Sequence, residues 1–151
     1  MDVEWKLEPN RREPKVIILA GEITPELEEL ARQLAGLSLA PLTVWRGDRA
    51  LLIEQRDFLR FYADGRGISA QTVQKEAYAV RLRLYELEER LDRRRFVRIS
   101  NSEIVNLEHV TALDLSLTGT IRMTLGHSVN TYVSRRYVKR IKEALGLRKE
   151  R

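Results

Sequence analysis

The sequence predicts a mostly β protein of the α+β class, and three features support this. From residue 42 onward, short segments that alternate apolar and polar residues are separated by turn residues, as in antiparallel strands. Three other segments repeat apolar residues at helical spacing, and all three are short. The length of 151 residues and the 43% of hydrophobic residues fit one compact domain with a modest extension.

The N-terminal part predicts an extension of one strand and one helix. Residues 1–15 are polar and contain two prolines, so we expect a poorly ordered lead or a short edge strand there. The β-branched run 15–20 favours a strand, and Thr24 followed by Pro25 is typical of a helix start. The helix should end at Gly36 and carry an apolar stripe that must be buried. The stripe consists of Leu27, Leu30, Ala31 and Leu34.

The next part predicts a meander of short strands joined by glycine-containing turns. A helix over 82–92 interrupts it, because Leu84, Leu87 and Leu91 share one face and charged residues fill the other. Ser134 is expected to cap a last helix that ends at Gly146. Strands are expected at 42–45, 50–53, 58–63, 68–72, 76–80, 96–99, 104–105, 110–115, 120–125 and 129–133. The apolar side of the last helix contains Val138, Ile141, Ala144 and Leu145.

Charge is distributed unevenly along the chain. The formal net charge of +5 and the isoelectric point near 9.7 are compatible with a polyanionic partner. Residues 1–40 hold five Lys or Arg and eight Asp or Glu, a net charge of −3. Residues 41–151 hold the other 22 basic and 14 acidic residues, a net charge of +8. The basic character therefore belongs to the C-terminal part.

Several classes of chemistry lack a motif in this sequence. The chain has no cysteine, which excludes disulfides, thiolate nucleophiles and thiolate metal sites. His109 and His127 have no metal-ligand spacing, and neither a phosphate-binding glycine motif nor a nucleophile elbow is present. We therefore expect no enzyme activity, cofactor, metal or small-molecule substrate. The longest apolar runs are too short to cross a bilayer, so we expect a cytoplasmic protein without membrane contact.

The most informative segment is 134–142, which places five cations on the opening turns of the last helix. Cations near a helix N-terminus oppose its dipole by roughly 0.3–1 kcal/mol each. Arg135 and Arg136 also repel the like charges of Lys139 and Arg140 one turn later. Bound phosphate would relieve both effects. The alternative is a solvated basic face on an amphipathic helix.

A second candidate lies around Asn101, in a polar run that starts at Arg98. An asparagine amide can bond adenine with two hydrogen bonds and an arginine can do the same to guanine, each worth about 1–3 kcal/mol of discrimination. The alternative for Asn101 is a turn residue that bonds its own backbone, which is the commoner use of asparagine.

Two segments resemble the central and closing motifs of the LytTR family of bacterial transcriptional regulators. They are FVRISNSEIVNL at residues 96–107 and YVSRRYVKRIK at residues 132–142, and the resemblance extends over about 42–147. It implies elongated antiparallel β-sheets with short helices that insert loops, rather than a recognition helix, into successive major grooves of double-stranded DNA. Such domains usually bind paired direct repeats.

The resemblance also implies roles for individual residues. Asn101 and Arg136 match base-contacting positions. The first DNA-contacting loop falls near residues 66–69, where Ile68 stands at the position of a histidine found in some members, so this chain lacks that base-reading side chain. Phosphate or supporting contacts are expected from Arg66, Ser69, Ser102, Arg135, Tyr137 and Lys139.

The expected organisation is an extension over 1–40, a LytTR-like DNA-binding domain over 41–147 and a basic tail over 148–151. No receiver domain of roughly a hundred residues precedes the DNA-binding part, so we expect no phosphorelay control. We hypothesise that the leucine stripe of the extension mediates packing or dimerisation, giving a homodimer at least on DNA. The alternative function is a protein-interaction module whose basic end docks an acidic partner. RNA binding is disfavoured because few aromatic residues occur on the strands.

Overall fold

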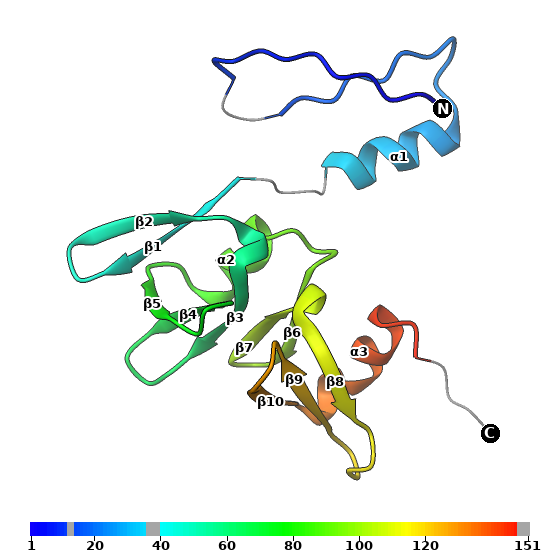
Figure 1. Cartoon of the computed structure of the whole chain (residues 1–151). Helices are drawn as coiled ribbons and strands as arrows, with labels where there is room; N and C mark the ends of the chain where they lie inside the picture. The colour runs from blue at the N-terminus through cyan, green and yellow to red at the C-terminus, as the bar shows by residue number, and fades with distance from the viewer. Residues whose placement is uncertain (12–13, 36–39, 148–151) are drawn as a thin grey trace.

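The computed structural model describes residues 1–11, 14–35 and 40–147, and two antiparallel sheets form its main body (Figure 1). The larger sheet has the strand order β2-β1-β5-β4-β3-β7-β6, and the smaller sheet has the order β10-β9-β8. The larger sheet contains β1 (Leu42–Arg46), β2 (Arg49–Ile53), β3 (Phe58–Ala63), β4 (Ile68–Thr72), β5 (Ala77–Val80), β6 (Phe96–Ser100) and β7 (Glu103–Asn106). The smaller sheet contains β8 (Val110–Asp114), β9 (Ile121–Leu125) and β10 (Val129–Val133).

The helices are short, as the sequence predicts. They are α1 (Pro25–Ala35), α2 (Leu84–Arg90) and α3 (Val138–Ala144), with 3-10 turns η1 (Gln55–Asp57), η2 (Leu107–His109) and η3 (Arg135–Tyr137). The predicted mostly β, antiparallel fold is confirmed, and most strand ends lie within one residue of the expected ones. In the part of the chain that is described, no helix is both long and apolar enough to cross a membrane.

Two hydrophobic cores lie on opposite faces of the larger sheet. Successive side chains of a strand point to opposite faces. Phe58 and its neighbour Leu59 on β3 therefore enter different cores, as do Ile104 and Val105 on β7. All four side chains are at most 2% exposed. Because β3, β6 and β7 contribute side chains to both cores, these strands fix the position of one core relative to the other.

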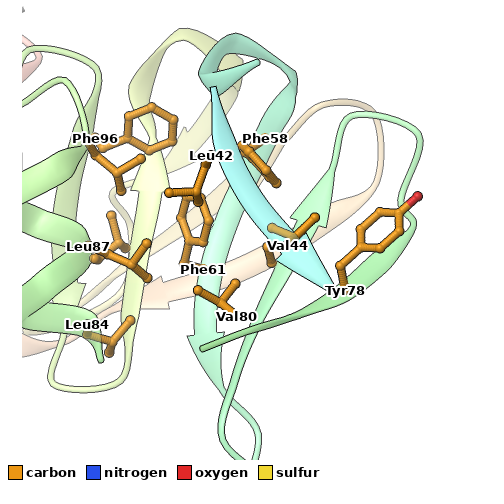
Figure 2. Close-up of a cluster of buried hydrophobic side chains, with 12 residues drawn as sticks. Leu42, Val44, Phe58, Phe61, Tyr78, Val80, Leu84, Leu87 and Phe96 are labelled. Atoms are coloured by element: carbon orange, nitrogen blue, oxygen red, sulfur yellow. The ribbon is translucent and has the colours of Figure 1, made fainter. Parts of the chain in front are cut away.

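The first core packs α2 against the larger sheet (Figure 2). Leu84 and Leu87 reach from α2 toward the aromatic side chains of the sheet, where the rings of Phe58 and Phe61 lie 4.9 Å apart. Leu91, just after the helix, is also buried. The predicted leucine face of this helix is therefore confirmed, although the helix itself spans only Leu84–Arg90.

The second core packs the smaller sheet and α3 against the other face of the larger sheet. Ile99, Met123 and Ile141 are fully buried in it. Val138 and Leu145 of the predicted apolar side are partly buried, as expected. Ala144, which we expected on the same side, is exposed; the buried side of α3 is formed by Val138, Ile141 and Leu145 at positions i, i+3 and i+7.

The N-terminal extension differs from the prediction in two ways. Thr24 caps α1 as expected, since its Oγ1 accepts a hydrogen bond from the Leu27 N–H at 3.2 Å. The run 15–20 forms no strand, because no strand in the described residues pairs with it. The leucine stripe of α1 is not buried: its leucines are half-buried and Ala31 is exposed. The expected stop at Gly36 and the tail 148–151 lie outside the described residues.

The last helix begins differently from the prediction. Ser134 precedes η3 and makes no side-chain capping bond, and Tyr137 holds the N-cap position of α3. Arg135 and Arg136 therefore lie on a 3-10 turn and not on the first turn of an α-helix. Lys139 remains in the first turn of α3, where its charge opposes the helix dipole.

Candidate nucleic-acid interface

Three connections lie next to one another at one end of the sheets, and we call them the loop face: residues 64–67 between β3 and β4, 101–102 between β6 and β7, and 134–140 after β10. The Ala63 N–H donates to the Ser102 carbonyl at 2.9 Å and joins the first two. The Ser134 N–H donates to the Ile99 carbonyl at 2.8 Å and brings the third beside β6. The structure thus gathers the predicted site residues from distant parts of the sequence.

Asn101 is exposed at the β6–β7 turn. Its carbonyl accepts a hydrogen bond from the Arg98 Nη1 at 2.8 Å, which fixes the backbone of the turn. Its Oδ1 accepts a hydrogen bond from the Tyr137 hydroxyl at 3.3 Å. A carboxamide oxygen has two lone pairs, so Oδ1 can accept a second hydrogen bond while Nδ2 donates. The Asn101 side chain is therefore held in place without losing its capacity to pair with a base edge.

Ser102 is also exposed, beside Asn101. Its N–H donates to Ser100 Oγ at 3.1 Å, and the two hydroxyl oxygens lie 3.3 Å apart. A register shift between Arg98 and Ser100 in the β6–β7 pairing marks a bulge here. Bulges re-aim side chains at the end of a strand. The turn thus presents Asn101 and two hydroxyl groups at one place.

Tyr137 connects this turn to the cations after β10. The guanidinium carbons of Arg136 and Arg140 lie 5.9 and 5.8 Å from the centre of its ring. Both distances are within the range of a cation–π contact, which contributes about 0.5–1 kcal/mol at an exposed site. The ring packs against the second core. Tyr137 therefore contacts two arginines with its ring and Asn101 with its hydroxyl.

Arg135 extends over the β8–β9 turn. Gly119 in this turn has φ +77°, and a Cβ placed there would lie 2.9 Å from the Arg135 Nε and 3.0 Å from its Nη2. The guanidinium therefore lies against the glycine, and a side chain at this position would displace it. Lys139 is exposed one turn later.

The β3–β4 turn is organised around Asp64. Its Oδ2 accepts a hydrogen bond from the Ser69 hydroxyl at 2.6 Å, and its Oδ1 accepts one from the Arg66 N–H at 3.0 Å. These bonds, that of Ser69 first, hold the pKa of Asp64 below its ordinary value. Because a hydroxyl has one hydrogen to donate, Ser69 supports the turn and would have to release Asp64 to bond a phosphate. The Arg66 side chain is exposed.

Arg98 was a candidate for base reading, and the structure gives it another role. Its Nε donates to Glu88 Oε1 at 2.9 Å, and its side chain is only 14% exposed. Glu88 lies on α2, so this ion pair ties the β6–β7 turn to the first core. Arg98 is therefore a positioning residue for Asn101.

Glu103 is a positioning residue that the sequence analysis missed. It directly follows the β6–β7 turn and is 9% exposed. Its Oε1 accepts a hydrogen bond from Thr131 Oγ1 of β10 at 2.7 Å, and its Oε2 lies 3.3 Å from Arg60 Nη1 of β3. Burial raises the pKa of Glu103, and the bonds from Thr131 and Arg60 oppose that change. The carboxylate thus links the two sheets that carry the loop face.

The arrangement defines a class of protein. Exposed cations and hydrogen-bonding side chains meet on loops at the end of an antiparallel β fold, so the candidate site is one for a polyanion such as nucleic acid, approached by loops. Comparison with known families agrees: the model described as the LytTr DNA-binding domain matches residues 48–146. The chain belongs to the LytTR family.

Similar proteins match this chain over nearly its whole length. An uncharacterized HTH-type transcriptional regulator of Staphylococcus aureus strain NCTC 8325 is 33% identical over 148 residues, covering 97% of this chain and 99% of its own. A second such regulator, from strain MSSA476, is 42% identical over 96 residues and 64% of each chain. Among solved structures, the LytTr DNA-binding domain of a Bacillus cereus protein described as a methyl-accepting/DNA response regulator has a TM-score of 0.67. It is 20% identical, and the match covers 71% of this chain and 97% of that one.

Proposed function

We propose that this protein is a bacterial, sequence-specific transcriptional regulator that binds double-stranded DNA through its loop face. The observation that carries the proposal is the joining of Asn101 to the basic segment 134–140 through the Tyr137 hydroxyl. Family membership and the regulators among its relatives support the same function. Activity of this kind would place the protein in the cytoplasm and needs no catalytic group.

The side chains of the loop face divide into two kinds. Asn101 and Arg136 are proposed to contact base edges in the major groove, where each pair of hydrogen bonds discriminates by about 1–3 kcal/mol. Arg66, Ser102, Arg135 and Lys139 are proposed to attract phosphates, which supplies affinity and register without reading sequence. Ser69 and Tyr137 support the turns that carry them.

The order of helices and strands in the described residues differs from that of a helix-turn-helix protein. The name HTH-type in the relatives refers to a helix-turn-helix, in which two α-helices are joined by a short turn. In the described part of this chain, strands lie between α1, α2 and α3. We therefore propose that loops, and not a recognition helix, enter successive major grooves. The resemblance to the LytTR family implies that two copies bind a pair of direct repeats, and we propose the same for this protein. In this proposal residues 41–147 bind DNA, 1–40 form an extension and 148–151 a basic tail.

The experiment that tests the function is selection of bound sequences from a randomised duplex pool, followed by fluorescence anisotropy at two salt concentrations. Enrichment of a spaced pair of short repeats is expected. The slope of log affinity against log salt should correspond to several phosphate contacts, at about −0.9 per contact. Weak binding that salt abolishes, with no enriched sequence, would overturn the proposal in favour of an interaction module whose basic end docks an acidic protein.

A further inference from the structure

The extension carries a concentration of exposed apolar side chains that the rest of the protein lacks. Among the described residues, nine large hydrophobic side chains before residue 24 are at least 38% exposed, whereas residues 40–147 have six. Trp5 and Leu19 are 88% and 91% exposed. We call these nine the extension surface: Met1, Val3, Trp5, Leu7, Val16, Ile17, Ile18, Leu19 and Ile23.

The extension surface is not covered by the protein's own DNA-binding part. Neither hydrophobic core contains a residue of the extension. Helix α1 has no buried residue, and its leucine stripe is only half covered. In Figure 1, α1 and the N-terminal residues lie to one side of the sheets. Nine exposed apolar side chains on two short segments are more than the scattered single ones that are normal on a protein surface, which points to an interaction site.

The charges of the extension stand apart from its apolar residues. In residues 1–8 apolar and charged residues alternate, so an extended backbone puts the charges on one face and Trp5 with its apolar neighbours on the other. In α1, Glu26 and Glu29 lie outside the stripe formed by Leu27, Leu30 and Leu34. Two apolar faces of this kind can meet without burying a charge, and the net charge of −3 over residues 1–40 opposes contact of the extension with DNA.

We propose that the occupant of the extension surface is the extension of a second copy of this chain. Each of the nine side chains can bury on the order of 100 Å² of surface, so together they can bury roughly 900 Å². One partner contributes about this area to a stable interface of standard size. The run 15–20 has the β-branched composition of a strand but lacks a strand partner among the described residues, and the same run of a second copy can pair with it. Two identical extensions would thus cover the apolar surface of each other and give the run 15–20 a strand partner.

The proposal rests on the proposed function in one respect only, since paired repeats on DNA call for two DNA-binding units. Joining two units raises the effective concentration of the second on a paired site, so that affinity for paired repeats exceeds that for one repeat by about 100-fold or more. The extension would then act as the tether between the two loop faces.

The test is the molar mass of the full chain without DNA, measured by sedimentation and light scattering. Dimers of twice 17.6 kDa are expected to accumulate as the concentration rises toward about 100 µM. The double variant Trp5→Glu Ile17→Glu should raise the dissociation constant of the dimer at least about tenfold, because it places two charges in the apolar interface. Both positions are exposed, so neither change disturbs a core.

The control is Leu52→Glu, which adds one negative charge, against two in the double variant, at a leucine of β2 that is 73% exposed. This variant should dimerise like the unaltered protein. A chain that stays monomeric at the highest concentration, or a double variant that dimerises as well as Leu52→Glu, overturns the proposal. A monomer that still selects a DNA sequence would leave the proposed function intact, whereas a dimer that selects none would leave only the dimer.

Discussion

The Tyr137 hydroxyl donates a hydrogen bond to Asn101 Oδ1 across 3.3 Å, although 36 positions separate the two residues in the sequence. The bond joins the β6–β7 turn to the segment after β10. In this geometry Asn101 and Arg136 are not independent, because both side chains contact the same tyrosine. A regulator that reads bases with these two residues would depend on Tyr137 for their relative position.

Tyr137→Phe should therefore weaken binding to the selected DNA by about 2- to 12-fold, which corresponds to the roughly 0.5–1.5 kcal/mol of one hydrogen bond. The free energy of unfolding should change by less than about 0.5 kcal/mol, since the hydrogen bond is exposed and the ring still packs against the second core. Anisotropy titrations and urea unfolding measure the two effects.

The control for this prediction is a double-mutant cycle with Asn101→Ala. Once the asparagine is absent, removal of the tyrosine hydroxyl should have little further effect on affinity. Full additivity of the two losses would mean that the bond does not position Asn101 for DNA.

Gly119→Ala tests whether the β8–β9 turn positions Arg135. The added Cβ would lie 2.9 Å from the Arg135 Nε, so the guanidinium must move. Alanine at φ +77° also costs about 1–2 kcal/mol of stability. If Arg135 contacts a phosphate, the slope of log affinity against log salt should fall by about one.

The matched variant is Gly47→Ala in the β1–β2 turn. Gly47 has φ +60°, and a Cβ there meets no atom within 4 Å, so this change carries the backbone cost alone. Both variants should lose similar stability in urea unfolding, but only Gly119→Ala should alter the salt slope. An equal slope in the two variants would show that Arg135 tolerates displacement.

Most of the fold could be predicted from the sequence because its signals are local. Alternation over 58–63 and 68–72 predicted β3 and β4 to the residue, and the spacing of Leu84 and Leu87 predicted the buried face of α2. The failed strand over 15–20 shows the limit: β-branched residues favour a strand, but a strand also needs a partner, which composition does not reveal.

The residues of the candidate site could be predicted from the sequence, but the contacts between their side chains could not. Motifs pointed to Asn101 and Arg136, yet the bond that joins them through Tyr137 depends on the packing of two sheets. Glu103 was missed for a related reason. All four residues of β7 are buried, including the polar residues Glu103 and Asn106 at its two ends. The contacts of Glu103 with Arg60 and Thr131 join residues that are distant in the sequence, so only the three-dimensional structure shows them.

Arg136→Ala and Lys139→Ala should separate the two kinds of contact. Loss of a base contact by Arg136→Ala should cost about 1–3 kcal/mol on the selected site and much less on random duplex. Lys139→Ala should weaken both duplexes equally and lower the salt slope by about one. The two variants remove the same charge from neighbouring exposed positions, so each is a control for the other. Equal losses by Arg136→Ala on both duplexes would contradict its role in base reading.

Glu103 gives the fold a predictable response to pH. Burial raises the pKa of its carboxyl above the ordinary value in the folded protein, so between those two pKa values the folded state holds a proton that the unfolded state has released. The contribution of Glu103 to the free energy of unfolding therefore decreases as pH rises from about 4.5 through the raised pKa. The lost stability returns when the pH is lowered again. Glu103→Gln cannot ionise but keeps an oxygen that can accept the Thr131 hydrogen bond. Relative to this variant, the unaltered protein should lose stability as pH rises through that window, which urea unfolding at a series of pH values measures. A parallel pH dependence of the two proteins would mean that attraction to Arg60, 3.3 Å away, fully offsets the cost of burying the carboxylate.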